Sequence, residues 1–318
     1  TVFGLTKSGD GLLTLAGDNT YEGETTVLTG SVLRVAHARG LGSLVGVTRV
    51  HNGGTLELSG NITVDETVVL NGDAAGTDGA LCSVEGTNTW RGTLSQSSRS
   101  RVGATGGSML ALSCAVTGPG LYVSPGAGSS VALLGQPLNL GANTLYAHGL
   151  GTLVVGVSGN VWSTLEVAGL TVRTDLPNVL PASAALALGS SAHLDAFVDL
   201  NGNDQTVGQL KRGITTSGNR LVTSLKPATL TVNQTSSTYY YDGNLGGALS
   251  LVKSGGGTLV LLGTGNTYAG VTVVNAGTLT VNAGCRLGHS TRTVVNGGTL
   301  KLMTETALSD ESELAIAD

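Results

Sequence analysis

The feature that most restricts the fold of this sequence is a stretch of 31 residues that occurs twice, at residues 5–35 and 251–281. The first copy reads LTKSGDGLLTLAGDNTYEGETTVLTGSVLRV and the second reads LVKSGGGTLVLLGTGNTYAGVTVVNAGTLTV. Within each copy, short pieces alternate apolar and polar residues, and Gly or Asn bounds each piece. This pattern predicts short strands with one buried face, joined by tight corners.

The spacing of equivalent leucines indicates how these strands are arranged. Successive leucines are 20 to 23 residues apart. They are Leu13, Leu33 and Leu56 in the first region, and Leu259, Leu279 and Leu300 in the second. A period of about 20 residues with several strands inside it is typical of a β-solenoid, in which each strand pairs in parallel with its copy one turn away. The alternative is one or two antiparallel sandwiches, which do not need the same pattern repeated in the same phase.

We therefore expect one β-solenoid over residues 1–318, with rungs of about 20 residues. The repeat is weaker over residues 65–180, where we expect less regular rungs with longer loops or a side insertion. The chain opens inside a repeat and closes directly after a strand-like alternation. We interpret it as a fragment of a longer chain, with ends that are either cuts or surfaces for end-to-end self-association.

Composition excludes several classes of function. Glycine accounts for 50 of the 318 residues, charged residues are only 12%, and the net charge is −5 with Lys and Arg scattered singly or in pairs. No basic patch is present for nucleic acid, and no run of about 18 apolar residues is present for a transmembrane helix. The cysteines Cys82, Cys114 and Cys285 lack metal-ligand spacing and are expected to be small buried side chains. The sequence does not specify whether Cys82 and Cys114 form a disulfide.

Three segments resemble a known family. The pattern KSGxGxLxLxGxNTYxGxTxV followed by a GTLxV strand, at residues 7–35 and 253–281, resembles the autotransporter-associated β-strand repeat of bacterial surface and secreted passenger proteins. The module LDLNGxxQTVGxL, matched at residues 198–210, commonly accompanies such repeats. The resemblance implies a right-handed parallel β-helix outside a Gram-negative-type cell. It implies no particular activity, because such passengers include adhesins and stalks.

Catalytic chemistry has few candidates. The densest acidic region contains Asp195, Asp199 and Asp204, and its DxNxND segment is superficially similar to a Ca²⁺ loop. It lacks the glycine and distal glutamate of such a loop, and Asn and Asp are common in turns, so we predict a polar corner. His148-Gly149 matches only a small part of a polygalacturonase motif, and the rest of that motif is missing. The remaining histidines, His37, His51, His193 and His289, are isolated and expected to be structural.

The run Tyr239-Tyr240-Tyr241 is the most unusual aromatic cluster, and it is a candidate contact patch for protein or sugar. Simple alternation predicts that Tyr240 points inward and that Tyr239 and Tyr241 point outward. The competing interpretation is ordinary packing within a strand.

These observations predict a non-enzymatic extracellular scaffold, adhesin or filament component that binds protein or glycan surfaces through its side faces. No catalytic residue, cofactor or metal site is predicted. The alternative is a carbohydrate-active β-helix enzyme acting on an acidic polysaccharide, which would need a groove with at least two facing carboxylates.

Overall fold

The computed structural model describes residues 3–74, 79–189, 195–214, 218–290, 292–309 and 312–317. The chain divides into two compact units, Thr1–Trp162 and Ser163–Asp318. Within the described residues the chain is all strand and turn, and it makes about 14 turns with a spacing of about 21 residues. Every strand pairing described in either unit is parallel. The predicted β-solenoid is confirmed, and the antiparallel sandwich is excluded.

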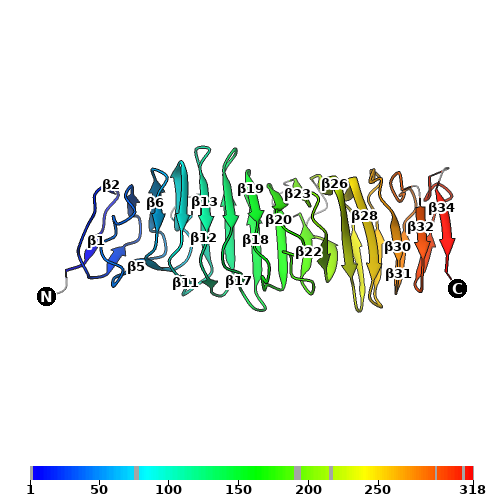
Figure 1. Cartoon of the computed structure of the whole chain (residues 1–318), viewed down its shortest axis with the longest axis horizontal. Coiled ribbons are helices and arrows are strands. Elements are labelled where there is room, and N and C mark those ends of the chain that lie inside the picture. The colour runs from blue at the N-terminus through cyan, green and yellow to red at the C-terminus, as the bar shows by residue number, and fades with distance from the viewer. Residues whose placement is uncertain are drawn as a thin grey trace. The chain divides into compact units, whose positions relative to one another are not determined.

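The first unit contains three parallel sheets whose strands follow one another in chain order (Figure 1). One sheet contains β1 (Leu5–Lys7), β3 (Thr25–Val27), β5 (Val47–Val50), β8 (Thr67–Leu70), β11 (Leu94–Gln96), β14 (Val116–Thr117) and β17 (Leu138–Asn139). The second contains β2 (Leu12–Leu15), β4 (Val32–Val35), β6 (Thr55–Ser59), β9 (Leu81–Glu85), β12 (Ser100–Ala104), β15 (Leu121–Pro125) and β18 (Thr144–His148). The third contains β7 (Thr63–Val64), β10 (Thr87–Trp90), β13 (Met109–Leu112), β16 (Ser130–Leu133) and β19 (Thr152–Val155).

The second unit also consists of parallel sheets. Its longest series contains β21 (Thr171–Thr174), β23 (Ala196–Asp199), β26 (Arg220–Asn233), β28 (Asn244–Ser254), β30 (Thr272–Val274), β32 (Arg292–Val295) and β34 (Glu313–Ile316), and β24 (Gln205–Val207) pairs with β26. A second series contains β20 (Thr164–Ala168), β22 (Ala185–Leu188) and β25 (Gln209–Arg212). The third contains β27 (Thr238–Tyr241), β29 (Thr258–Leu261), β31 (Thr278–Val281) and β33 (Thr299–Leu302).

The predicted leucine register is the observed register. Leu33 is the Cα partner of both Leu13 and Leu56, in adjacent turns of the first unit. In the second unit, Leu279 is likewise the partner of Leu259 and Leu300. Inward aliphatic side chains stack in columns along each sheet, and most of those in the middle turns are fully buried. Burial of these columns is the main favourable contribution to folding, at roughly 25 cal/mol per Å² of apolar surface.

The lysine that is shared by both copies of the repeat is buried at a corner. Lys253 has no exposed surface, and its Nζ donates hydrogen bonds to the carbonyl oxygens of Ser254, Gly255 and Ala276 at 2.6, 2.7 and 3.1 Å. Lys7 makes the corresponding bonds to its own corner. Burial lowers the pKa of Lys253. The lysine thus supplies hydrogen-bond donors to the backbone carbonyl groups of this corner.

Buried amide side chains join adjacent turns at other corners. Asn266 is 1% exposed, and its Oδ1 accepts a hydrogen bond from the Leu245 amide at 2.8 Å. Its Nδ2 donates to the carbonyl oxygens of Gly263 and Arg286, at 3.1 and 2.9 Å. Asn160 has a similar role in the first unit, where its Oδ1 accepts from the Leu138 amide at 2.8 Å. Because buried peptide groups need partners, these amides hold the turns in register.

A buried carboxyl group extends a column of inward-facing threonines in the first unit. Thr25 and Thr48 are Cα partners in adjacent turns, and both are fully buried. The hydroxyl of Thr48 donates to Glu66 Oε1 at 2.8 Å, and Glu66 is only 2% exposed. Desolvation, only partly offset by the Thr48 hydrogen bond, raises the pKa of Glu66 to about 7.

The cysteines are buried thiols, as the composition predicts. Cys82, Cys114 and Cys285 are at most 3% exposed. Burial raises the pKa of Cys114 to about 11, so its reactive thiolate form is disfavoured.

Replacing Asn266 with the similarly sized Leu is expected to lower the free energy of unfolding by about 2–4 kcal/mol, because three buried peptide groups lose their partners. The exposed Asn275→Ala is the control and is expected to stay within about 0.5 kcal/mol of the wild type. Urea unfolding followed by circular dichroism measures both. Equal midpoints for the two variants would contradict the proposed role of the buried amide.

Glu66 is expected to make stability depend on pH. Its folded pKa lies above the ordinary value of 4.5, so its protonated form stabilises the fold below about pH 4.5 and that contribution is lost as the pH rises through 7. Glu66→Gln should therefore lose less stability than the wild type between pH 5 and pH 8. Thermal unfolding of both proteins across this range tests the expectation. Parallel curves would show that Glu66 does not titrate as described.

Candidate functional site

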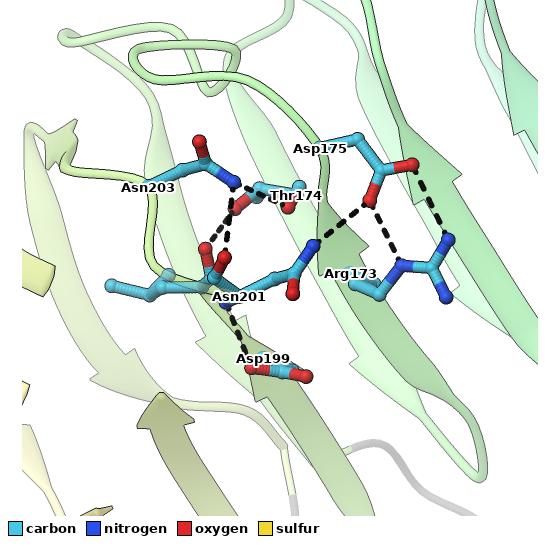
Figure 2. Close-up of polar contacts among 7 residues, drawn as sticks. Arg173, Thr174, Asp175, Asp199, Asn201 and Asn203 are labelled. Carbon is cyan, nitrogen blue, oxygen red and sulfur yellow. Dashed lines mark hydrogen bonds and ion pairs between the residues drawn. The ribbon is translucent and has the colours of Figure 1, made fainter. Parts of the chain in front are cut away.

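The acidic region of the sequence forms a hydrogen-bonded corner in the second unit (Figure 2). Arg173 pairs with Asp175, with Nε 2.9 Å from Oδ1 and a second nitrogen 3.3 Å from Oδ2. Asn201, one turn further along the chain, donates from Nδ2 to Asp175 Oδ1 at 3.2 Å. The charge of Asp175 is therefore compensated by the arginine, and the same carboxylate connects two successive turns.

The remaining acidic side chains of this region accept hydrogen bonds from the backbone. Asp199 Oδ1 accepts from the Asn201 amide at 2.8 Å, in a tight turn where Asn201 has a φ of 49°. Asp204 accepts from the Thr229 amide at 2.7 Å, and Asp195 accepts from the Asn219 amide at the same distance. This is the predicted polar corner. Within the described ranges, no group of three or more His, Cys, Asp or Glu side chains is arranged to hold a metal ion.

Among the histidines that the structure describes, none is grouped with two or more of these carboxylates. His37 and His289 lie in turns, as predicted, and His51 follows β5. His193 lies outside the described residues. His148 ends β18 on the other unit, where it joins an aromatic cluster described below.

The tyrosine run occupies β27, but the predicted orientation of its side chains is wrong. Tyr241 is fully buried and Tyr240 is 47% exposed, whereas alternation from the sequence places Tyr240 inside. The physical reason is the register with the next turn. Tyr241 is the Cα partner of Leu261, a core residue, and so shares its inward phase. Tyr239 is half-buried, with the Lys211 ammonium nitrogen 5.7 Å from its ring centroid.

A ladder of half-buried arginine and tyrosine side chains on the first unit, with one exposed arginine, was not predicted from the sequence. Arg101, Tyr122 and Tyr146 lie on β12, β15 and β18 and are Cα partners in three successive turns. Their neighbours Leu121 and Leu145 are fully buried, so this ladder lies on the outer face of the sheet. We call the five residues that meet there the Arg–Tyr ladder. They are Arg99, Arg101, Tyr122, Tyr146 and His148.

The two tyrosine rings of the Arg–Tyr ladder are stacked, and the arginine and histidine side chains pack around them. The Tyr122 and Tyr146 ring centroids are 4.4 Å apart with 27° between the planes. The Arg99 guanidinium carbon lies 4.9 Å from the Tyr122 centroid and 5.3 Å from the Tyr146 centroid. Arg101 lies 4.9 Å from the Tyr122 centroid and pairs with Asp73 at 3.4 Å. Such contacts fix the rings in place, while Arg99 itself remains exposed.

The sequence contained only a partial signal for this ladder. Arg99 and Arg101 are one of its two densest basic pairs, and Tyr122 and Tyr146 are 24 residues apart. That distance is one turn, but the repeat is too weak between residues 65 and 180 to fix which positions align. The register observed in the structure supplies the missing information.

Comparison with known proteins agrees with this architecture. The family described as passenger-associated-transport-repeat matches residues 5–35 and 251–281, which are the two copies of the repeat. The chain carries passenger-associated-transport repeats. In the first unit the matched segment contains strands β1 to β4. In the second unit it runs from within β28 to the end of β31.

A longer similarity extends beyond the repeats. The chain is 32% identical over 280 residues to the adhesin BmaC autotransporter of Brucella suis biovar 1 (strain 1330). The aligned region covers 86% of this chain but only 7% of that adhesin's length. No solved structure matches the chain. The chain is thus similar to a small part of an autotransporter adhesin.

In the part of the chain that the structure describes, no helix is long and apolar enough to cross a bilayer.

The acidic corner is expected to be indifferent to calcium, because its carboxylates already accept hydrogen bonds from Arg173 and from backbone amides. Asp199→Asn preserves an acceptor for the Asn201 amide and should fold normally. Thermal unfolding midpoints of the wild type and the variant should agree to within about 1 °C in EDTA and in millimolar CaCl₂. A rise in CaCl₂ that occurs in the wild type and not in the variant would identify a calcium site instead.

Proposed function

We propose that this chain is a non-enzymatic part of a bacterial surface adhesin that contacts protein or glycan surfaces outside the cell through the faces of its sheets. The observation that carries the proposal is the Arg–Tyr ladder, because aromatic and arginine side chains held on a rigid surface are the residue types that dominate recognition. The passenger repeats and the similarity to an adhesin support the extracellular setting.

The side faces suit this role for a physical reason. A parallel ladder fixes each outward side chain at an interval of about 4.8 Å from its neighbour in the next turn. Binding to such a face costs the protein little conformational entropy, because the rings are already packed against each other. The same regularity would let a long passenger present the face repeatedly, since turns are added without changing the cross-section.

Binding of the purified 318-residue chain to cultured epithelial cells tests the proposal. Arg99→Ala combined with Tyr146→Ala should reduce binding by about tenfold, because two side chains of the ladder are lost. The control combines Thr14→Ala with Arg34→Ala, which removes an outward pair from the same sheet. Equal binding by the two double variants would reject the ladder as the contact surface, and no binding by the wild type would reject adhesion by this segment.

An activity assay on acidic polysaccharides separates the adhesin from the enzymatic alternative. We expect no turnover, since Asp175 and Asp199 are engaged in the corner contacts described above. Turnover that Asp199→Ala abolishes would overturn the non-enzymatic proposal. Electron microscopy of the same sample would show whether the chain also associates end to end into filaments.

A further inference from the structure

The first unit contains one arginine whose charge is not matched by a carboxylate. Five of its six arginines each form an ion pair with a carboxylate of a neighbouring turn. They are Arg34, Arg39, Arg49, Arg91 and Arg101. Among the described residues, no carboxylate lies within ion-pair distance of the sixth, Arg99, which is exposed. Arg99 therefore brings an uncompensated positive charge to the Arg–Tyr ladder.

Arg99 is held in position although it has no ion pair. Its guanidinium carbon lies 4.9 and 5.3 Å from the ring centroids of Tyr122 and Tyr146. A side-chain carbon at Gly120 would lie 3.6 Å from both Cγ and Cδ of Arg99, so the aliphatic part of the arginine packs over this glycine. Gly120 also has a φ of 134°, which favours glycine. The arginine therefore loses little further freedom when its charged end binds a ligand.

The two rings that contact Arg99 supply further polar groups. Within the part of the chain that the structure describes, the Tyr122 and Tyr146 hydroxyls form no hydrogen bond, and neither is among the buried polar atoms that lack a partner. Both hydroxyls are therefore accessible to solvent, and each can donate or accept a hydrogen bond. A guanidinium that lies over a ring keeps its N–H groups for a carboxylate, which it binds through two parallel hydrogen bonds.

The pairing of the strands argues against a peptide ligand. β12 is paired with β9 and β15, and β15 is paired with β12 and β18, so neither strand has a free edge beneath the ladder. Recognition of an extended peptide by strand addition needs such an edge. A ligand of this surface must therefore be recognised through side chains alone.

The charges around the ladder limit how many negative groups the ligand can carry. Arg101 is already paired with Asp73 at 3.4 Å, and the net charge of the chain is −5. One unpaired guanidinium matches one carboxylate, whereas a densely sulfated polymer would be repelled by the acidic chain. Hydroxyl groups beside that carboxylate would hydrogen-bond to the tyrosine hydroxyls.

We propose that the Arg–Tyr ladder binds a sugar that carries a single carboxylate, a uronic or sialic acid, with the carboxylate on Arg99 and the sugar hydroxyls at Tyr122 and Tyr146. This inference rests on the proposed function of the ladder as a contact surface, and it names the class of ligand. The sugar is bound and not cleaved.

Titration of the purified 318-residue chain with methyl glycosides tests the proposal, with saturation-transfer NMR as the readout. The acidic probes are the glycosides of glucuronic, galacturonic and N-acetylneuraminic acid, and the neutral probes are those of glucose and galactose. We expect at least one acidic sugar to bind with a Kd in about the millimolar range, about tenfold or more tighter than the neutral sugars. Its affinity should fall as NaCl is added. Equal affinity for acidic and neutral sugars, or no binding of any sugar, would overturn the proposal.

Variants of single arginines test whether Arg99 holds the carboxylate. Arg99→Gln should weaken binding of the acidic sugar about tenfold, and Arg99→Lys should retain part of the affinity because it keeps the charge. The matched control is Arg91→Gln, because Arg91 is an exposed arginine of the same unit that is already paired with Asp65. It should leave the affinity unchanged. An equal loss in both glutamine variants would reduce the effect to overall charge and reject the site.

Two further outcomes separate this proposal from its neighbours. A polyglutamate peptide that binds with dependence on Arg99, when no acidic sugar binds, would overturn the sugar as ligand. If the ladder double variant loses cell adhesion but the wild type binds no acidic sugar, the adhesin proposal stands and this one fails. If the wild type binds the sugar but not cells, this proposal stands and adhesion by this segment is rejected.

Discussion

The structure depends on parallel hydrogen bonding between each strand and the equivalent strand one turn away. In this arrangement the neighbour of a residue is the residue about 21 positions further along the chain, so each turn must repeat the phase of the last. Leu13, Leu33 and Leu56 satisfy this constraint with one aliphatic column. A shift of one residue in any turn would move its apolar side chains to the solvent face, which explains why the sequence repeats the same pattern.

The corners impose a second requirement, because a chain that turns this often leaves backbone groups outside the ladders. Buried polar side chains provide hydrogen-bond partners for these backbone groups. Lys253 donates to three carbonyl groups, and Asn266 bonds three backbone groups in neighbouring turns. Lys253 and Asn266 belong to the KSG and NTY segments that both copies of the repeat share, so part of what is repeated has a structural role at corners. Acidic residues at other corners accept hydrogen bonds from backbone amides, which gives the acidic cluster a structural role at these corners.

Much of the fold could be predicted from the sequence, and the candidate contact surfaces could be predicted only in part. The two long copies of the repeat were enough to align the leucines with the correct partners. Tyr240 was placed on the wrong face because alternation within a strand has two possible phases, and only the pairing of Tyr241 with Leu261 selects one. The Arg–Tyr ladder was missed because its members are separated by whole turns in the region of weakest repetition.

The most direct test of the parallel register is disulfide trapping of two pairs of outward residues in β31 and β33, after removal of the native cysteines. Thr278 and Thr299 are Cα partners, and so are Thr280 and Lys301. Parallel strands place both pairs about 4.8 Å apart, within reach of a disulfide. The account predicts that Thr278→Cys with Thr299→Cys, and Thr280→Cys with Lys301→Cys, both form a disulfide readily. In an antiparallel hairpin at most one pair can be adjacent, so a disulfide in only one of the two variants would contradict the parallel solenoid.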